Sequence, residues 1–160
     1  MSQILVHLFR HNRWANGLMV EACRSLSENQ LDTTVEGTYG SIRDTLNHLA
    51  SAEGGYVFRL TGQPRPLVHD DPFPGVDRIS EILERTGAAL EEVAAGLNQE
   101  KTIEVNRPEG AVTIPAFVIL LQAVNHATDH RSHIATILTQ LGIEPPGLDL
   151  WDYNEQVLGA

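Results

Sequence analysis

Apolar residues recur every three or four positions in four stretches of the chain, which is the period of an amphipathic α-helix. The stretches are residues 2–26, 41–61, 77–97 and 114–141. Helices of this length bury their apolar faces against one another, so the pattern predicts an all-α fold, an antiparallel four-helix bundle. A chain of 160 residues fits one domain, which we expect to span residues 1–160.

Cap and turn residues predict where these helices begin and end. Ser41 followed by Asp44 has the form of a capping box, in which each side chain bonds the backbone N–H of the other residue. Pro115 suits the first turn of the last helix, and Gly142 suits a position just past its end. Residues 61–76 hold four prolines and two glycines, so they predict a long crossover between the second and third helices. Residues 102–105 are expected to form a short extended piece.

The composition excludes several classes of partner and site. The formal net charge is −10, from 11 basic and 21 acidic residues, and it repels phosphate backbones and anionic membranes. We therefore expect neither nucleic acid nor a membrane as a partner. Cys23 is the only cysteine, which argues against a disulfide framework or a thiolate metal site. No segment resembles a signal peptide or a membrane span, so we expect a cytoplasmic protein.

His126 and His130 stand four residues apart in the last predicted helix. Side chains at this spacing lie on one face, so the two imidazoles can reach the same metal ion. The same stripe contains Ile119, Ala123 and Ile137, which would aim the histidines at the core. A buried imidazole without a partner costs about 1–3 kcal/mol, so these histidines need either hydrogen bonds within the core or a metal ion.

A metal ion held by two histidines requires a further ligand from a neighbouring helix. His48, near the middle of the second predicted helix, is the best candidate, whereas His69 lies in the Pro-rich crossover. His133 lies roughly 10 Å along the helix from His126, too far to share the ion, and is expected in the pocket or against a ligand.

Other titratable residues leave alternatives open. Glu53 and His133 are candidate catalytic residues for proton transfer, although Glu53 suits an exposed salt bridge equally well. His7 and His11 form a second pair at helical spacing, in mixed surroundings that suit an exposed or interfacial position as well as metal binding.

Four segments of the chain resemble one known family. They are residues 11–16 (HNRWAN), 37–49 (GTYGSIRDTLNHL), 125–131 (NHATDHR) and 141–146 (LGIEPP), the last followed by Asp149 and Tyr153. Together they resemble the DinB family of metalloenzymes over nearly the whole chain. The chain departs from the family's frequent His-Arg-Gly-Gln ending of the third segment, with Ser132 and His133 in the last two places.

The resemblance implies an up-down-down-up bundle, commonly a homodimer, with one nickel or zinc ion held by His48, His126 and His130. It also implies a link to thiol-dependent transferases and isomerases that use bacillithiol, mycothiol or glutathione. Apolar residues outside the inward stripes, such as Ile4 and Leu5, favour a homodimer independently.

Three neutral imidazoles leave the charge of a divalent ion uncompensated, so a thiol or water beside the ion loses its proton readily. Our first hypothesis is a metal-dependent thiol transferase or hydrolase that activates a low-molecular-weight thiol or water toward a small electrophile. The alternatives are a non-catalytic metal-binding bundle and a stress-response interaction domain.

Overall fold

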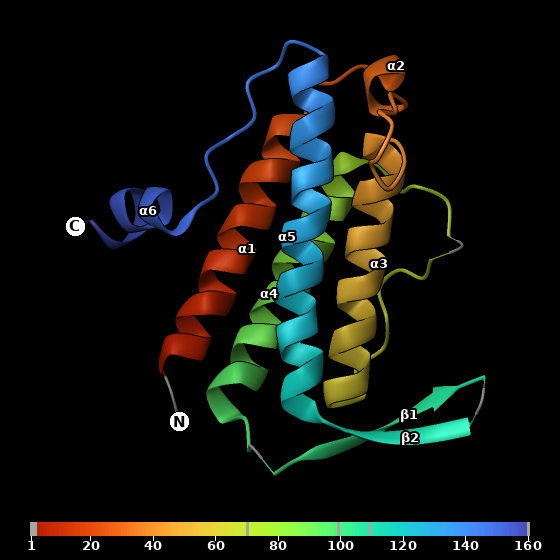
Figure 1. Cartoon of the computed structure of the whole chain (residues 1–160), viewed down its shortest axis with the longest axis vertical. Helices are drawn as coiled ribbons and strands as arrows, with labels where there is room; N and C mark the ends of the chain where they lie inside the picture. Colours follow the sequence, from red (N-terminus) through yellow and green to blue (C-terminus); the bar gives the residue numbers. More distant parts are fainter. Residues whose placement is uncertain (1–2, 70, 99, 109, 160) are drawn as a thin grey trace.

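Four long helices form the core of the computed structural model, which describes residues 3–69, 71–98, 100–108 and 110–159 (Figure 1). The helices are α1 (Gln3–Cys23), α3 (Ile42–Thr61), α4 (Val76–Gly96) and α5 (Ala116–Gln140). None of the described helices combines the length and the apolar character that crossing a bilayer requires. The predicted four-helix bundle is confirmed.

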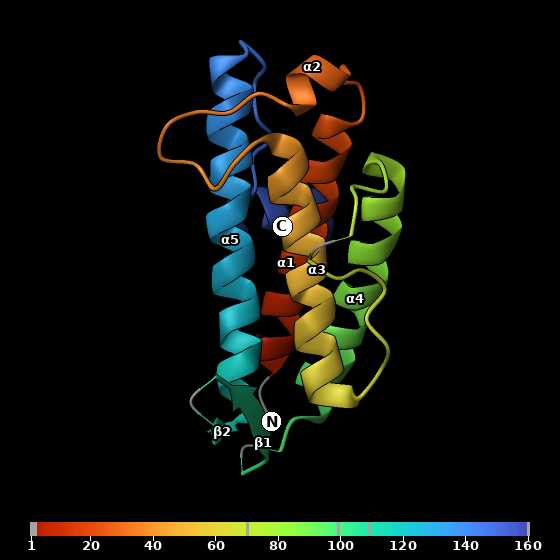
Figure 2. The ribbon, with the colours of Figure 1, turned by 90° about the vertical axis from the view of Figure 1, so that its right-hand side faces the viewer.

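The helices pack in a ring, with α1 and α3 each in contact with both α4 and α5 (Figure 2). In the view of Figure 1 the chain runs upward along α1 and α5 and downward along α3 and α4. Residues 62–75 therefore return along the length of the bundle to join α3 to α4, which confirms the long crossover. The site described below lies between α3 and α5.

The capping and turn residues correctly predicted where α3 begins and where α5 ends. The Ser41 side chain accepts a hydrogen bond from the Asp44 N–H at 3.1 Å, and the Asp44 carboxylate accepts one from the Ser41 N–H at 3.2 Å. The predicted capping box is thus confirmed. Gly142, with φ of 73°, takes the left-handed conformation that ends α5, and the Ile143 N–H donates to the Leu138 carbonyl at 2.9 Å.

A β-hairpin corrects the all-α prediction. Strand β1 (Thr102–Arg107) pairs in antiparallel register with β2 (Gly110–Pro115) at the lower end of α3 and α5 (Figure 1). Only the first part of β1 was predicted as extended. Pro115 is the last residue of β2, paired with Thr102, so its predicted place in the first helical turn is wrong. The Ala116 N–H donates to the Lys101 carbonyl at 2.8 Å, so the pairing holds this backbone extended up to the first residue of α5.

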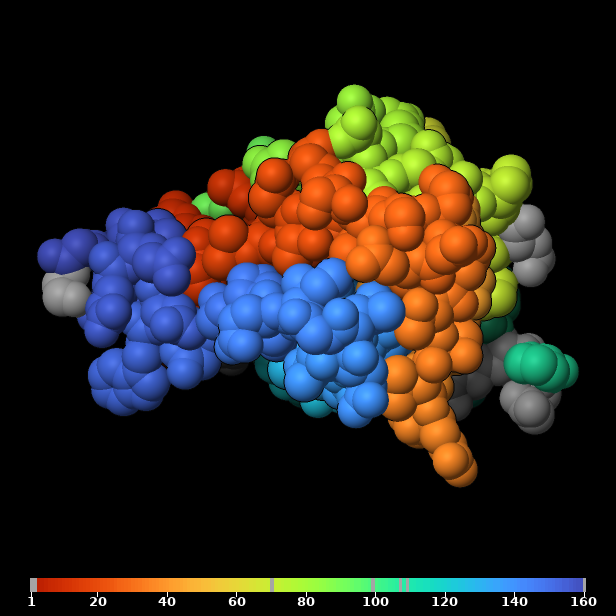
Figure 3. All heavy atoms as spheres, turned by 90° about the horizontal axis from the view of Figure 1, so that it is seen from above, coloured from red at the N-terminus to blue at the C-terminus, as the bar shows by residue number. Residues whose placement is uncertain are grey.

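Short helical turns that the pattern did not predict complete the fold. They are α2 (Glu28–Leu31), α6 (Leu150–Tyr153) and a π-helical turn η1 (Asn154–Leu158). The C-terminal segment stands out from the bundle on the side of α1 (Figure 3). It is held there by His11, whose Nε2 lies 2.8 Å from the Leu148 carbonyl, and by an edge-on contact between the Trp14 and Tyr153 rings.

Candidate metal centre

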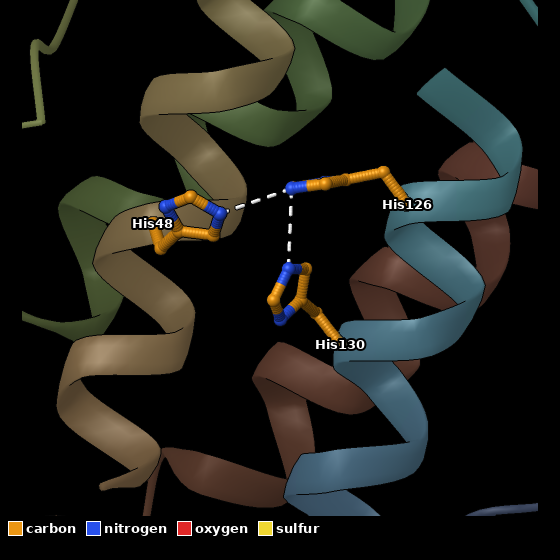
Figure 4. Close-up of side chains that lie close together, drawn as sticks. All are labelled: His48, His126 and His130. Atoms are coloured by element: carbon orange, nitrogen blue, oxygen red, sulfur yellow. Dashed lines mark hydrogen bonds between the residues drawn. The ribbon is translucent and has the colours of Figure 1, made fainter. Parts of the chain in front are cut away.

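Helices α3 and α5 bring His48, His126 and His130 together, with their rings pointing toward one another (Figure 4). The Nε2 atom of His126 lies 3.0 Å from Nε2 of His48 and 3.1 Å from Nε2 of His130. One ligand nitrogen from each residue lies within 4.8 Å of the other two. The spacing of four residues aligns the two histidines of α5, and the packing of α3 against α5 supplies the third.

The donor set fits a divalent metal ion. Imidazole nitrogens that bind zinc tetrahedrally at about 2.0–2.1 Å lie roughly 3.3–3.4 Å apart, close to the separations found here. The three atoms that converge are all Nε2, and one cation can accept the lone pairs of all three together. The ring protons would then lie on Nδ1; the Nδ1 atoms of His48 and His130 are buried and have no hydrogen-bond partner among the described residues.

The surroundings keep these imidazoles neutral, which is the form that binds metals. Burial, together with the neighbouring His130 and His48, lowers the pKa of His126 to about 4. Burial likewise lowers the pKa of His130 to about 4, with His48 and His133 acting in the same direction. The pKa of His48 is also lowered, first by burial and then by His69.

Tyr39 and His69 cover the outer side of His48, and sequence reasoning missed this arrangement. The Tyr39 ring stacks on His48 with centroids 4.3 Å apart and meets His130 edge-on at 4.9 Å. Its hydroxyl lies 3.2 Å from Nε2 of His69, which stands in the crossover. Neither residue lies on a helix, so no periodic pattern points to them.

An open pocket of about 550 Å³ lies beside His48 and His126. The hairpin supplies Val105 and Ile114 to its wall, and the crossover supplies Arg65 and His69. The remaining lining residues come from α3 and α5: Ser51, Ala52, Gly55, Tyr56, Arg59, Val118, Ile119 and Gln122. The volume suits a small organic molecule.

The histidines lie at the seam between two helices rather than in the centre of the core. His126 and His133 are half-buried, whereas Ala127 and Ile134 are buried, so the core-facing stripe of α5 is rotated from the predicted one. The prediction that His126 and His130 both face the core is therefore wrong for His126, whereas His130 is buried. This rotation leaves His126 at the wall of the pocket.

Glu53 belongs to a polar network inside the bundle. Its carboxylate accepts hydrogen bonds from the Thr86 hydroxyl at 2.5 Å and from the Asn16 side-chain amide at 3.1 Å. Only 2% of Glu53 is exposed, so the predicted alternative of an exposed salt bridge is wrong. It is not among the residues that line the pocket, so the position does not support a proton-transfer role there. Burial raises the pKa of Glu53 to about 7 against the opposing effects of Thr86 and Arg131.

Arg131, which the sequence reasoning overlooked, carries the positive charge of this network. It is 4% exposed and donates to the side-chain oxygens of Asn12 at 2.8 Å and Asn16 at 2.6 Å. Burial lowers its pKa to about 10. Asn12 and Asn16 stand four residues apart among apolar neighbours in α1, and this spacing is the signal that could have indicated a buried polar partner.

His133 lies against His130 but outside the pocket lining. Their ring centroids are 5.5 Å apart, and Nε2 of His133 lies 4.0 Å from the Asp129 carboxylate. Asp129, His130 and His133 form a second group close enough to hold an ion. The two groups share His130, so an ion at the second group would compete with an ion at the first for this ligand. The second group also includes an exposed carboxylate.

His7 and His11 do not form a pair directed at one point. His11 packs against the C-terminal segment through Leu148, Trp14 and Tyr153. His7 is exposed and lines an apolar pocket between α1 and that segment. The interfacial alternative is confirmed for His11. Cys23 is buried in the core, and burial raises the pKa of its thiol to about 12.

Several solved structures share this fold, and two of them are similar over nearly the whole chain. A DinB-like protein from Bacillus cereus ATCC 10987 matches with a TM-score of 0.71 and 16% sequence identity, over 91% of this chain and 95% of that one. YfiT from Bacillus subtilis, described as a probable metal-dependent hydrolase with an unusual four-helix bundle topology, matches with a TM-score of 0.63 and 19% identity, over 90% of this chain and 91% of that one.

The sequence itself matches a family model. Among curated proteins no sequence matches the chain. The model of the DinB family, however, matches residues 1–157, which is nearly the full length. The chain therefore belongs to the DinB family.

Proposed function

We propose that His48, His126 and His130 hold one divalent ion, nickel or zinc, and that the protein is an enzyme that activates a thiol or water toward a small electrophile. The proposal is supported by one observation: the three histidines converge, and two of them, His48 and His126, lie at the wall of an open pocket. Structural zinc sites are closed by four protein ligands, whereas catalytic sites keep a position open for water or substrate. The description of YfiT as a probable metal-dependent hydrolase supports the same class of activity.

When bound, the ion would lower the pKa of a thiol or water beside it. The protein's own contribution is to hold three neutral imidazoles in place and to shape the pocket. Tyr39 stacks on His48 and fixes the plane of that ring. His133 packs against His130 and is proposed to position it rather than to bind the ion.

We also propose that His69, rather than Glu53, accepts the proton of the bound thiol or water. Glu53 is enclosed in the buried network, whereas His69 lines the pocket with its ring centroid 5.5 Å from that of His48. A proton acceptor has to lie within reach of the group that it deprotonates, directly or through one water. His69 meets this requirement from the pocket wall.

Metal analysis of the purified protein tests the ligand assignment. We expect about one divalent ion per chain, and we expect His48→Ala, His126→Ala and His130→Ala each to lose it, because two imidazoles hold an ion poorly. His133→Ala is the matched control and should keep the metal. Full occupancy in His48→Ala would refute the assignment, and metal loss in His133→Ala alone would move the site to Asp129, His130 and His133.

Activity separates the enzyme from a non-catalytic metal-binding bundle. Chelation should abolish thiol-dependent transfer to a model electrophile, or hydrolysis of a model ester, while the circular dichroism of the helices stays nearly unchanged. The bundle should survive because apolar packing between four helices contributes most of the stability. A protein that unfolds on chelation and shows neither activity when loaded would be a structural metal protein.

A further inference from the structure

Two arginines line the pocket that contains His48 and His126. Arg59 comes from the last turns of α3, and Arg65 comes from the crossover that packs along the same helix. They bring positive charge to one pocket of a protein whose formal net charge is −10. The pocket therefore differs in charge from the protein as a whole.

Both guanidinium groups lie over Gly55. A Cβ atom placed on this glycine would lie 3.2 Å from Nη1 of Arg59 and 3.7 Å from Cζ of Arg65, so the two groups share the space that a side chain would fill. The Arg59 Nη1 donates to the Gly55 carbonyl at 3.2 Å, and the Arg65 Nη2 donates to the Ser51 carbonyl at 3.3 Å. Backbone carbonyls thus position two like charges next to each other.

No carboxylate neutralises this pair within the described part of the chain. Arg10, Arg13, Arg24, Arg43 and Arg78 each form an ion pair with a glutamate or aspartate. Arg59 and Arg65 form none with a described residue, and among these residues they donate to the backbone carbonyls of Gly55 and Ser51. Two adjacent guanidinium groups repel each other unless an anion lies between them, and their planar donors match a carboxylate or phosphate.

The pair also lies at a useful distance from the histidines. Ser51 and Gly55 follow His48 on the same helix by three and seven residues, which corresponds to a rise of roughly 5 and 10 Å. His48, Ser51, Ala52 and Gly55 lie along one face of α3 and all line the pocket. A small molecule can therefore reach the histidines with one end and the two arginines with the other.

We propose that Arg59 and Arg65 form an anion subsite, so that the pocket takes a small molecule bearing a carboxylate or phosphate about one to two helical turns from its reacting atom. Only the position of the reacting atom, at the histidines, rests on the proposed function. The anionic group itself needs only the two guanidiniums and Gly55, which makes room for them.

Two thiols that differ only at their far end test the subsite. Cobalt-loaded protein is titrated with 6-mercaptohexanoate and with 6-mercapto-1-hexanol, and the dissociation constants are read from the cobalt absorption spectrum. We expect 6-mercaptohexanoate to bind about tenfold more tightly than the alcohol, because its carboxylate forms charge-assisted hydrogen bonds with exposed guanidinium groups. Added salt should reduce this difference in affinity. Arg59→Gln with Arg65→Gln should abolish the preference. Arg85→Gln, an exposed arginine of α4 outside the pocket, is the matched control and should keep it.

Calorimetry with succinate and with inorganic phosphate completes the test, because neither probe needs the thiol chemistry. Succinate or phosphate that binds wild type and the Arg85→Gln control, but not the double variant, supports the subsite even if no thiol changes the cobalt spectrum, and in that case the thiol hypothesis fails. The stronger of the two probes identifies the anion. Equal binding of both thiols, or a carboxylate preference that survives in the double variant, would overturn the subsite and leave the proposed metal function standing.

Discussion

Burial sets the protonation of the histidines at the candidate metal site and of Glu53. His126 and His130 stay neutral because they are partly removed from water. Their Nε2 atoms lie 3.1 Å apart, and Nε2 of His48 lies 3.0 Å from that of His126. Glu53 lies deeper, in the network with Thr86 and Asn16, and its raised pKa comes from the same loss of solvent. A group that favours its uncharged form in the folded protein makes stability depend on pH.

The raised pKa of Glu53 predicts that its contribution to stability falls as the pH rises. Its pKa is about 7 in the folded protein and near 4.5 in the unfolded chain, so between these pH values only the folded state holds the proton. Stability from this group is present below pH 4.5 and is lost as the pH rises to about 7. Relative to Glu53→Gln, wild type should therefore lose on the order of 3 kcal/mol across this window. Urea unfolding at several pH values measures the difference.

The comparison with Glu53→Gln cancels the histidines, which are present in both proteins. Glu92→Gln, an exposed glutamate of α4, is the matched control and should show a difference that hardly varies with pH. If the difference for Glu53→Gln is equally flat, the carboxyl is not held in its protonated form by burial.

Among the elements of the fold, the crossover and the hairpin complete the walls of a pocket beside α3 and α5. Gly54 lets the crossover approach α3, since a Cβ atom there would lie 3.0 Å from Cδ of Pro66. The neighbouring residues Arg65 and His69 of the crossover line the pocket, as do Val105 and Ile114 of the hairpin. A glycine within a helix costs roughly 1 kcal/mol relative to alanine. Gly54 makes room for the Pro66 ring, and Gly55 makes room for the guanidinium groups of Arg59 and Arg65.

Leucine at two helical glycines tests this packing. Gly54→Leu should lower the free energy of unfolding by about 1–3 kcal/mol, because the side chain has to displace Pro66 and the crossover. Gly17→Leu, in α1 with nothing within 4 Å of its Cβ position, should raise stability by about 0.5–1 kcal/mol. Denaturant unfolding compares them, and equal stabilisation by both substitutions would show that the crossover is not seated on Gly54.

The features that could be predicted from the sequence are those with a local cause. The helical period, the Ser41 cap and the four-residue spacing of His126 and His130 each depend on neighbours in the chain, and the structure has all three. The features that were missed depend on distant segments. Strand β2 was assigned in part to the next helix because its apolar residues fit either pattern, and His69 reaches the site only because the crossover folds back along α3.

At the scale of the whole molecule, apolar surface remains outside the bundle core. Ile4 and Trp151 are each 78% exposed, and both line the apolar pocket between α1 and the C-terminal segment. Phe117 and Leu121 are also exposed on α5. Large exposed apolar side chains of this kind mark contact surfaces.

We predict that the protein forms a homodimer through such surfaces. Light scattering should give twice the monomer mass of 17.6 kDa at micromolar concentration, with dissociation on dilution. Trp151→Ser should weaken the dimer if the C-terminal pocket takes part, whereas Phe117→Ser should weaken it if α5 does. A monomer mass that does not change with concentration would contradict the prediction.

X-ray absorption spectroscopy of the zinc-loaded protein, with and without 6-mercapto-1-hexanol, shows which atoms surround the metal. We predict three imidazole nitrogens and one light atom, with a sulfur scatterer at about 2.3 Å once the thiol is added. His133→Ala should give the same spectra. Four protein ligands that the thiol leaves unchanged, or fewer than three imidazoles, would contradict a pocket-facing site held by His48, His126 and His130.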